Sequence, residues 1–201
     1  MNSTTDKELY TSVFLAGFLV LMVELIQIKL IAFFVGSISH FLAIPIALFG
    51  LALGSIGFHF MARERALEVV RTASVALYGV LVAQFLTFFW VANTFFDKIH
   101  VSVHLPSTVV GELIVYTLLF LPCYALIGAL FSAAFSAGAD KVGRLYCADL
   151  AGAALACFVT PTLFTFTDLP AVILVLLASA LVLLVTMASS RRLKMRSLSR
   201  P

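Results

Sequence analysis

The chain has 201 residues, of which 62% are hydrophobic and only 11% are charged, and its net charge is +3. An ordinary soluble domain is about half apolar and about a quarter charged, and a chain this short cannot hide such an excess in a single core. The composition therefore excludes an ordinary soluble domain and predicts an all-α membrane protein. The basic residues are scattered over short loops and one tail, so the positive charge does not indicate nucleic-acid binding.

Six apolar runs of roughly the 20 residues that cross a bilayer follow one another along the chain. The predicted transmembrane helices cover about residues 10–35, 40–61, 72–92, 109–137, 145–166 and 171–188. Between and after them we expect a short turn at 36–39, a charged loop at 62–71, a longer connection at 93–108, a polar loop at 138–144 and a basic tail at 191–201. The first apolar run is too long for a signal-peptide core and lacks a clear cleavage site, so we interpret it as a retained helix.

The lysines and arginines predict how this six-helix bundle is oriented. Eleven of the 13 fall on the side that holds the N-terminus, the 62–71 and 138–144 loops and the tail. The opposite side holds only Lys98, and Lys29 lies within the first helix. Because basic residues are retained in the cytoplasm, both termini are predicted to be cytoplasmic.

Small residues recur at a spacing of four in three predicted helices. They are Gly50 and Gly54 in the second, Gly128, Ser132 and Ser136 in the fourth, and Ala148, Gly152 and Ala156 in the fifth. Small side chains allow two helix backbones to approach closely in lipid. We therefore expect Gly50, Gly54, Gly128 and Gly152 at helix contacts, although glycine and alanine are also common in membrane helices generally.

Four ionisable residues lie inside predicted spans, where each costs roughly 2.5–3.5 kcal/mol near the bilayer centre: Glu24, Lys29, Glu112 and Asp149. Glu24 and Gln27 are three residues apart and share a helix face, whereas Lys29 lies about 140° around the axis from Glu24. Glu24, Gln27, Lys29 and Glu112 are predicted to form a polar intramembrane cluster. Lys29 would bond Glu112 or extend to the headgroups. In one reading this cluster is a functional pocket, and in the other the charges only fix helix packing.

Asp149 lies near the inner end of the fifth predicted helix, on the edge of the small-residue stripe that contains Gly152. It should therefore face a neighbouring helix rather than lipid. Arg144 and Tyr146 are close in sequence at the cytoplasmic interface. We predict that Arg144, Tyr146 and Asp149 form a structural clamp at the base of this helix.

The sequence predicts no catalytic residues, no metal site and no cofactor. Ser-His-Asp, H-E-x-x-H and Gly-x-Ser-x-Gly arrangements do not occur. His100 and His104 would share a metal only on a helix, and the alternating HVSVHL segment favours an extended chain instead. Cys123, Cys147 and Cys157 all fall in apolar stretches and are predicted to be small buried hydrophobes, not a disulfide or zinc framework.

Three segments resemble the membrane region of polytopic spermidine synthase-like proteins of bacteria: MVELIQIKLIAFFVGS (22–37), HFLAIPIALFGLALGS (40–55) and VGRLYCADLAGAALA (142–156). In the first, Glu24 falls on the family's acidic residue and Lys29 on its arginine, whereas Val23 and Gln27 replace a tyrosine and a tryptophan. The third, which is the most specific, matches at Gly143, Arg144, Tyr146, Asp149 and Gly152.

The resemblance implies a domain of the bacterial inner membrane that anchors or regulates a cytoplasmic aminopropyltransferase-like domain or subunit, in polyamine synthesis. This chain, which ends at Pro201, has no Gly-x-Gly-x-x-Gly turn for a nucleoside site, so such activity would reside outside these residues. Two alternatives stay open. One is a transporter or binding protein for a small solute such as a polyamine, using the polar cluster. The other is an accessory subunit that packs, as a homo- or hetero-oligomer, within a larger membrane complex.

Overall fold

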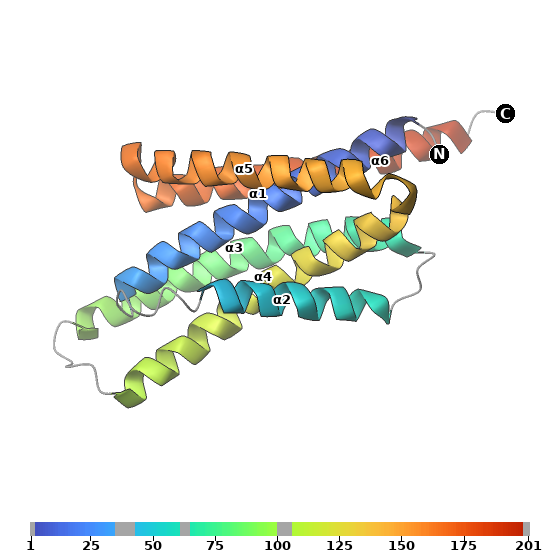
Figure 1. Ribbon diagram of the computed structural model, residues 1–201. Coiled ribbons are helices and arrows are strands. Elements are labelled where there is room, and N and C mark those ends of the chain that lie inside the picture. Colours follow the sequence, from blue (N-terminus) through green and yellow to red (C-terminus); the bar gives the residue numbers. More distant parts are fainter. Residues whose placement is uncertain (1–2, 35–42, 61–64, 100–105, 199–201) are drawn as a thin grey trace.

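The computed structural model describes residues 3–34, 43–60, 65–99 and 106–198, which form an all-helical bundle without a strand. The elements in chain order are α1 (Ser3–Phe34), α2 (Ala43–His59), α3 (Ala66–Ile99), α4 (Pro106–Ala137), the short 3-10 helix η3 (Ala139–Lys141), α5 (Val142–Phe166) and α6 (Leu169–Leu198). Successive helices run in alternating directions (Figure 1), so α1 begins and α6 ends at the same end of the bundle. We call this the basic end, because Lys7, Arg65, Lys141 and Arg144 lie there.

Within the described residues, five helical stretches are long and apolar enough to cross a membrane. They are Leu9–Leu30, Ala66–Thr87, Thr117–Ala137, Ala139–Phe166 and Leu169–Met187. Helices suit lipid because they satisfy their backbone hydrogen bonds internally. The prediction of an all-α chain with several helices of membrane-spanning length is confirmed.

The second predicted span, 40–61, contains α2 and extends beyond it on both sides. The 17 residues of α2 rise about 26 Å, slightly less than the roughly 30 Å of a bilayer core. Residues 35–42 and 61–64, on either side, lie outside the described residues. Six membrane crossings therefore stay a prediction.

Several helices are longer than the apolar runs that predicted them. Helix α3 begins at Ala66, inside the expected charged loop at 62–71, and continues to Ile99, inside the expected connection at 93–108. Helix α6 reaches Leu198 and so includes most of the expected 191–201 tail. The physical reason is that hydropathy marks only the apolar part of a helix, whereas Arg, Lys, Glu and Leu continue a helix readily in water. His100 and His104, predicted on an extended segment, lie outside the described residues.

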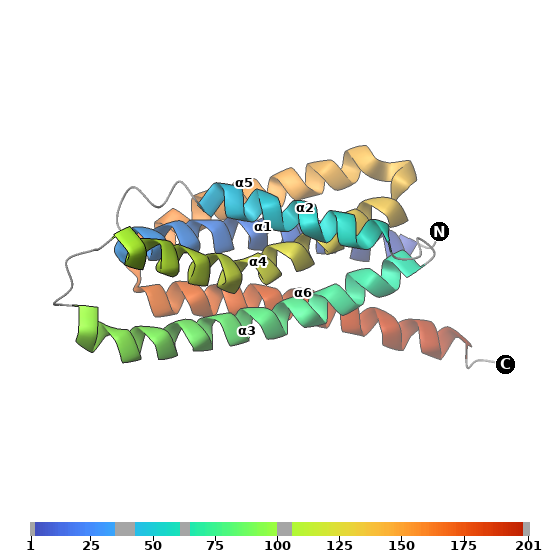
Figure 2. The same cartoon turned by 90° about the horizontal axis from the view of Figure 1, so that it is seen from below.

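Helix α1 is the centre of the bundle. It packs most extensively against α5, and it also contacts α2, α4 and α6. Helix α2 packs on α4, while α3 lies alongside α4 and α6 (Figure 2). Buried apolar side chains such as Leu19, Met22 and Ile26 of α1 and Ile127 of α4 fill the interior. The arrangement leaves α1 more enclosed than any other described span.

Glycines bring α1 and α5 together at the point of closest approach. A methyl group added at Gly152 of α5 would overlap the backbone of Phe14 on α1. A methyl group added at Gly17 of α1 would meet Asp149 of α5. The two glycines therefore allow the backbones to approach closely from both sides, as expected for helices that associate in lipid.

A second close contact joins α2 and α4. A methyl group at Gly54 would overlap the backbone of Ala125, and one at Gly50 would crowd Tyr124. In return, Gly128 of α4 faces the backbone of Leu51 on α2. All four glycines singled out from the sequence thus lie at helix–helix contacts in the structure.

The outward surface of the bundle is largely apolar. Large exposed side chains include Leu48, Phe49, Phe158, Phe166 and Leu174. This distribution suits a lipid solvent, in which an apolar exterior carries no penalty. It also corrects one prediction: Cys123 is buried, but Cys147 and Cys157 are exposed on α5. An apolar sequence context indicates burial only in water, because in a membrane small apolar residues can face lipid.

Candidate functional site

A hydrogen bond between two fully buried side chains links α1 to α4. The hydroxyl of Tyr124 donates to Oε1 of Gln27 over 2.6 Å, and both residues are completely enclosed by the apolar core. The other polar atom of the amide, Nε2 of Gln27, is buried without a hydrogen-bond partner. A buried unsatisfied donor is costly, so this half-satisfied amide is a polar feature of the interior that needs an explanation, as is the buried amide of Gln84 on α3, where neither polar atom has a partner.

Glu24 lies one turn before Gln27 on α1 and is half-buried. It is close enough to Tyr124 for the carboxyl and the hydroxyl to interact electrostatically. Gln27 therefore contacts Tyr124 directly, whereas Glu24 lies in the same region of α1 with no hydrogen bond to Tyr124. The sequence analysis missed Tyr124, although a tyrosine within an otherwise apolar helix was a usable signal, because buried tyrosine hydroxyls usually find a partner.

Lys29 points elsewhere. Its side chain is exposed, and Nζ lies 5.5 Å from the centre of the Phe164 ring on α5, the geometry of a cation–π contact. The helical rotation between Gln27 and Lys29 thus separates the predicted cluster into an inward-facing part and an outward-facing part. The side chain of Glu112 lies outside the described residues, so the contact between Lys29 and Glu112 stays a prediction.

The residues of the predicted clamp do not bond to one another. Asp149 is half-buried against Gly17 of α1, whereas Arg144 and Tyr146 are exposed. No hydrogen bond or ion pair joins these three residues in the described part of the chain. The carboxyl of Asp149 thus faces a neighbouring helix, while Arg144 and Tyr146 lie on the exposed surface.

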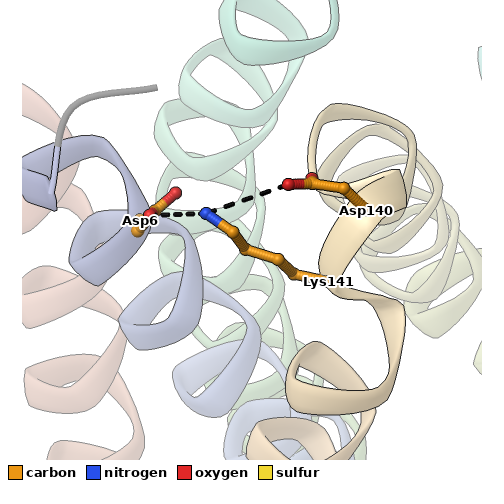
Figure 3. Close-up of polar contacts among 3 residues, drawn as sticks. All are labelled: Asp6, Asp140 and Lys141. Carbon is orange, nitrogen blue, oxygen red and sulfur yellow. Dashed lines mark hydrogen bonds and ion pairs between the residues drawn. The ribbon is translucent and has the colours of Figure 1, made fainter.

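An ion pair that the sequence analysis did not identify fastens the basic end instead. Lys141, in the turn between α4 and α5, donates from Nζ to Oδ2 of Asp6 on α1 over 2.6 Å. The same Nζ lies 3.9 Å from Asp140 (Figure 3). Asp6 and Lys141 are 135 residues apart, and no local pattern indicates that two such distant charges meet.

The described residues contain no group of three or more histidine, cysteine or acidic side chains placed to hold a metal ion. The chemistry that the site offers is hydrogen bonding: an amide and a hydroxyl held between two helices, with a carboxyl nearby. Comparison of the chain with known protein families, with curated proteins and with solved structures found no match. The resemblance to spermidine synthase-like membrane proteins therefore depends on the three sequence segments alone.

Proposed function

We propose that this chain is a multi-pass membrane domain that anchors or regulates a cytoplasmic aminopropyltransferase-like domain or subunit. Its expected location is the bacterial inner membrane, with both termini in the cytoplasm. The three similar segments suggest the partner, and the basic loops suggest the orientation. The structural observation that carries the proposal is the length of α6, which continues as one helix to Leu198 although its apolar stretch ends at Met187.

The part of α6 beyond Met187 has the properties of an attachment point. Residues 188–198 would project about 16 Å from the apolar stretch at 1.5 Å per residue. Their sequence includes RRLKMR, and basic residues at a helix C-terminus are favourable for the helix dipole and for the cytoplasmic side of a membrane. A partner held by this continuous helix would stay at a defined distance from the bilayer.

Site-specific photocrosslinking tests the partner. We would replace Met195 by p-benzoylphenylalanine, irradiate cells and identify the adduct by mass spectrometry. The matched control carries the same group at Ile114, an exposed position near the opposite end of the bundle. The expected result is an adduct with an aminopropyltransferase-like polypeptide from position 195 and none from 114. Failure to obtain an adduct at 195 would contradict the proposed anchoring role. An adduct with another class of protein would contradict the proposed link to polyamine synthesis.

Thiol labelling tests the orientation. In a background with the three native cysteines replaced by alanine, we would introduce Lys98→Cys or Ser197→Cys and treat intact cells with a membrane-impermeant maleimide. Position 98 should react from outside, whereas position 197 should react only after the cells are permeabilised. Equal reaction of both positions in intact cells would contradict the proposed topology.

The buried amide of Gln27 supports a second candidate, a binding site for a small polar solute such as a polyamine. Its unpartnered Nε2 and the nearby carboxyl of Glu24 offer a donor and an acceptor. Equilibrium binding of spermidine to the purified protein, with Glu24→Gln and Gln27→Leu as variants and Lys29→Met as the outward-facing control, tests this candidate. Binding that is weakened tenfold by the first two changes and not by the third would support it, and equal binding by all variants would exclude the pocket.

A further inference from the structure

A hollow of about 450 Å³ lies between α3 and α4, toward the basic end of the bundle. Arg65 and Glu68 line it at the start of α3. Farther along, its floor is apolar and is formed by Ala73 and Ala76 of α3 with Ala129 of α4. The volume is within the range of small-molecule sites, roughly 300–1,000 Å³. The hollow thus has a charged mouth and an apolar floor.

The sequence of α3 explains this shape. Residues 65, 68, 72 and 76 follow one another at helical spacing, so they lie along one face. From Arg65 to Ala76 the helix rises about 16 Å. The charged positions at the start of this face change to alanine farther along, and Ala73 and Ala76 have no side chain that could fill the space up to α4. These small side chains and Ala129 of α4 leave a groove that extends from Arg65 to Ala76, with Val69 and Leu126 also lining it.

The groove runs in the direction in which a lipid would lie. Arg65 immediately precedes the apolar stretch Ala66–Thr87, whereas Ala76 lies ten residues into it. In a bilayer the mouth would therefore be at headgroup depth and the floor at acyl-chain depth. This placement depends on the membrane insertion of α3, and it does not depend on the partner proposed above.

The two charges at the mouth are available to a ligand. Arg65 and Glu68 are both exposed, and neither forms a hydrogen bond or ion pair with another described residue. They carry opposite charges one helical turn apart. A guanidinium matches a phosphate well, and a carboxylate matches an ammonium group. The pair therefore complements a headgroup that carries both charges, and Glu68 disfavours a headgroup with a second negative charge.

We propose that this groove binds a phospholipid of the phosphatidylethanolamine type. The phosphate contacts Arg65, the primary ammonium donates hydrogen bonds to Glu68, and one acyl chain lies over Ala73, Ala76 and Ala129. Phosphatidylcholine keeps the phosphate and the positive charge, but its trimethylated nitrogen is bulkier and has no N–H to donate. The carboxylate of Glu68 thus distinguishes the two lipids, and the alanine floor supplies affinity that both lipids share.

The test reconstitutes the full chain in vesicles of equal parts phosphatidylethanolamine, phosphatidylcholine and phosphatidylglycerol. The protein is then extracted in mild detergent, and retained lipids are counted by native mass spectrometry. The wild type should retain phosphatidylethanolamine at least fivefold over each of the others. Glu68→Gln, an exposed change that leaves the core intact, should abolish the preference over phosphatidylcholine while lipid is still retained.

Two bulky substitutions on α3 test the floor. Ala76→Phe fills the groove and should remove most of the retained lipid. Val75→Phe, at an exposed neighbour outside the groove, should leave retention unchanged, and circular dichroism would show that both variants are folded. Retention without headgroup preference, a preference for phosphatidylglycerol, or an unchanged preference in Glu68→Gln would each overturn the proposal.

Discussion

Two polar contacts of equal length, 2.6 Å, join α1 to other parts of the bundle. One lies in the apolar core and the other at the partly exposed basic end. The bond from Tyr124 to Gln27 joins neutral groups that are completely enclosed by apolar side chains. The ion pair between Lys141 and Asp6 joins full charges, but the two side chains keep 27% and 22% of their surface exposed. The two contacts therefore differ mainly in how far water reaches the side chains, although Oδ1 of Asp6 is itself buried without a partner.

This difference reverses the order of the two contributions to stability that charge alone would suggest. At the basic end, water and salt screen the ion pair, so breaking it costs little. In the interior, a lost hydrogen bond leaves polar atoms without any partner. The neutral contact should thus contribute more to stability than the charged one, and four experiments test or extend this comparison.

The largest effect is expected for Tyr124→Phe. This change removes only the hydroxyl and leaves both polar atoms of the Gln27 amide unpaired in the core. We expect the free energy of unfolding in detergent to fall by about 1–2 kcal/mol, measured by denaturant-induced unfolding followed by circular dichroism. The control is Tyr78→Phe on α3. An effect no larger than that of the control would contradict the importance of the buried bond.

The double substitution Gln27→Leu with Tyr124→Phe sharpens the same point. Because it removes both partners together, no polar atom is stranded, and the loss should be smaller than the sum of the two single losses by about 1 kcal/mol. The same unfolding assay on all four proteins gives this coupling energy. Strictly additive losses would show that the two side chains do not interact.

A smaller effect is expected where Lys29 meets the ring of Phe164. Phe164→Leu keeps an apolar side chain at the contact with α5 but removes the aromatic face. The free energy of unfolding should fall by about 0.5 kcal/mol, and the decrease should vanish when Lys29 is already methionine. A decrease that persists in the Lys29→Met background would assign it to packing instead of the cation.

The smallest effect is expected for Lys141→Met, which breaks the ion pair at the basic end. The unfolding midpoint should shift less than for Tyr124→Phe, and the shift should shrink further as sodium chloride is raised, because salt screens exposed charges. Midpoints at low and high salt measure both statements. A large shift that salt does not alter would show that this ion pair contributes to stability as a buried contact does.

The candidate site was only partly predictable. Periodicity placed Glu24 and Gln27 on one face and Lys29 on another, because helical geometry is local. It could not show that Gln27 would meet Tyr124, which is 97 residues away. Nor could it show that Lys141, rather than Arg144, would fasten the basic end. Such partners depend on which helices are neighbours.

By itself, the sequence determined that the chain is helical with several apolar stretches of membrane-spanning length, the approximate places of its helices and the glycines that lie at helix contacts. These properties follow from composition, hydropathy and side-chain size, each of which can be evaluated over a short window. Only the tertiary structure decided that α1 is central, that α5 packs on α1 and α2 on α4, and which polar atoms are enclosed. In an apolar solvent hydrophobicity does not select neighbouring helices, so close packing and hydrogen bonds between distant segments make that choice.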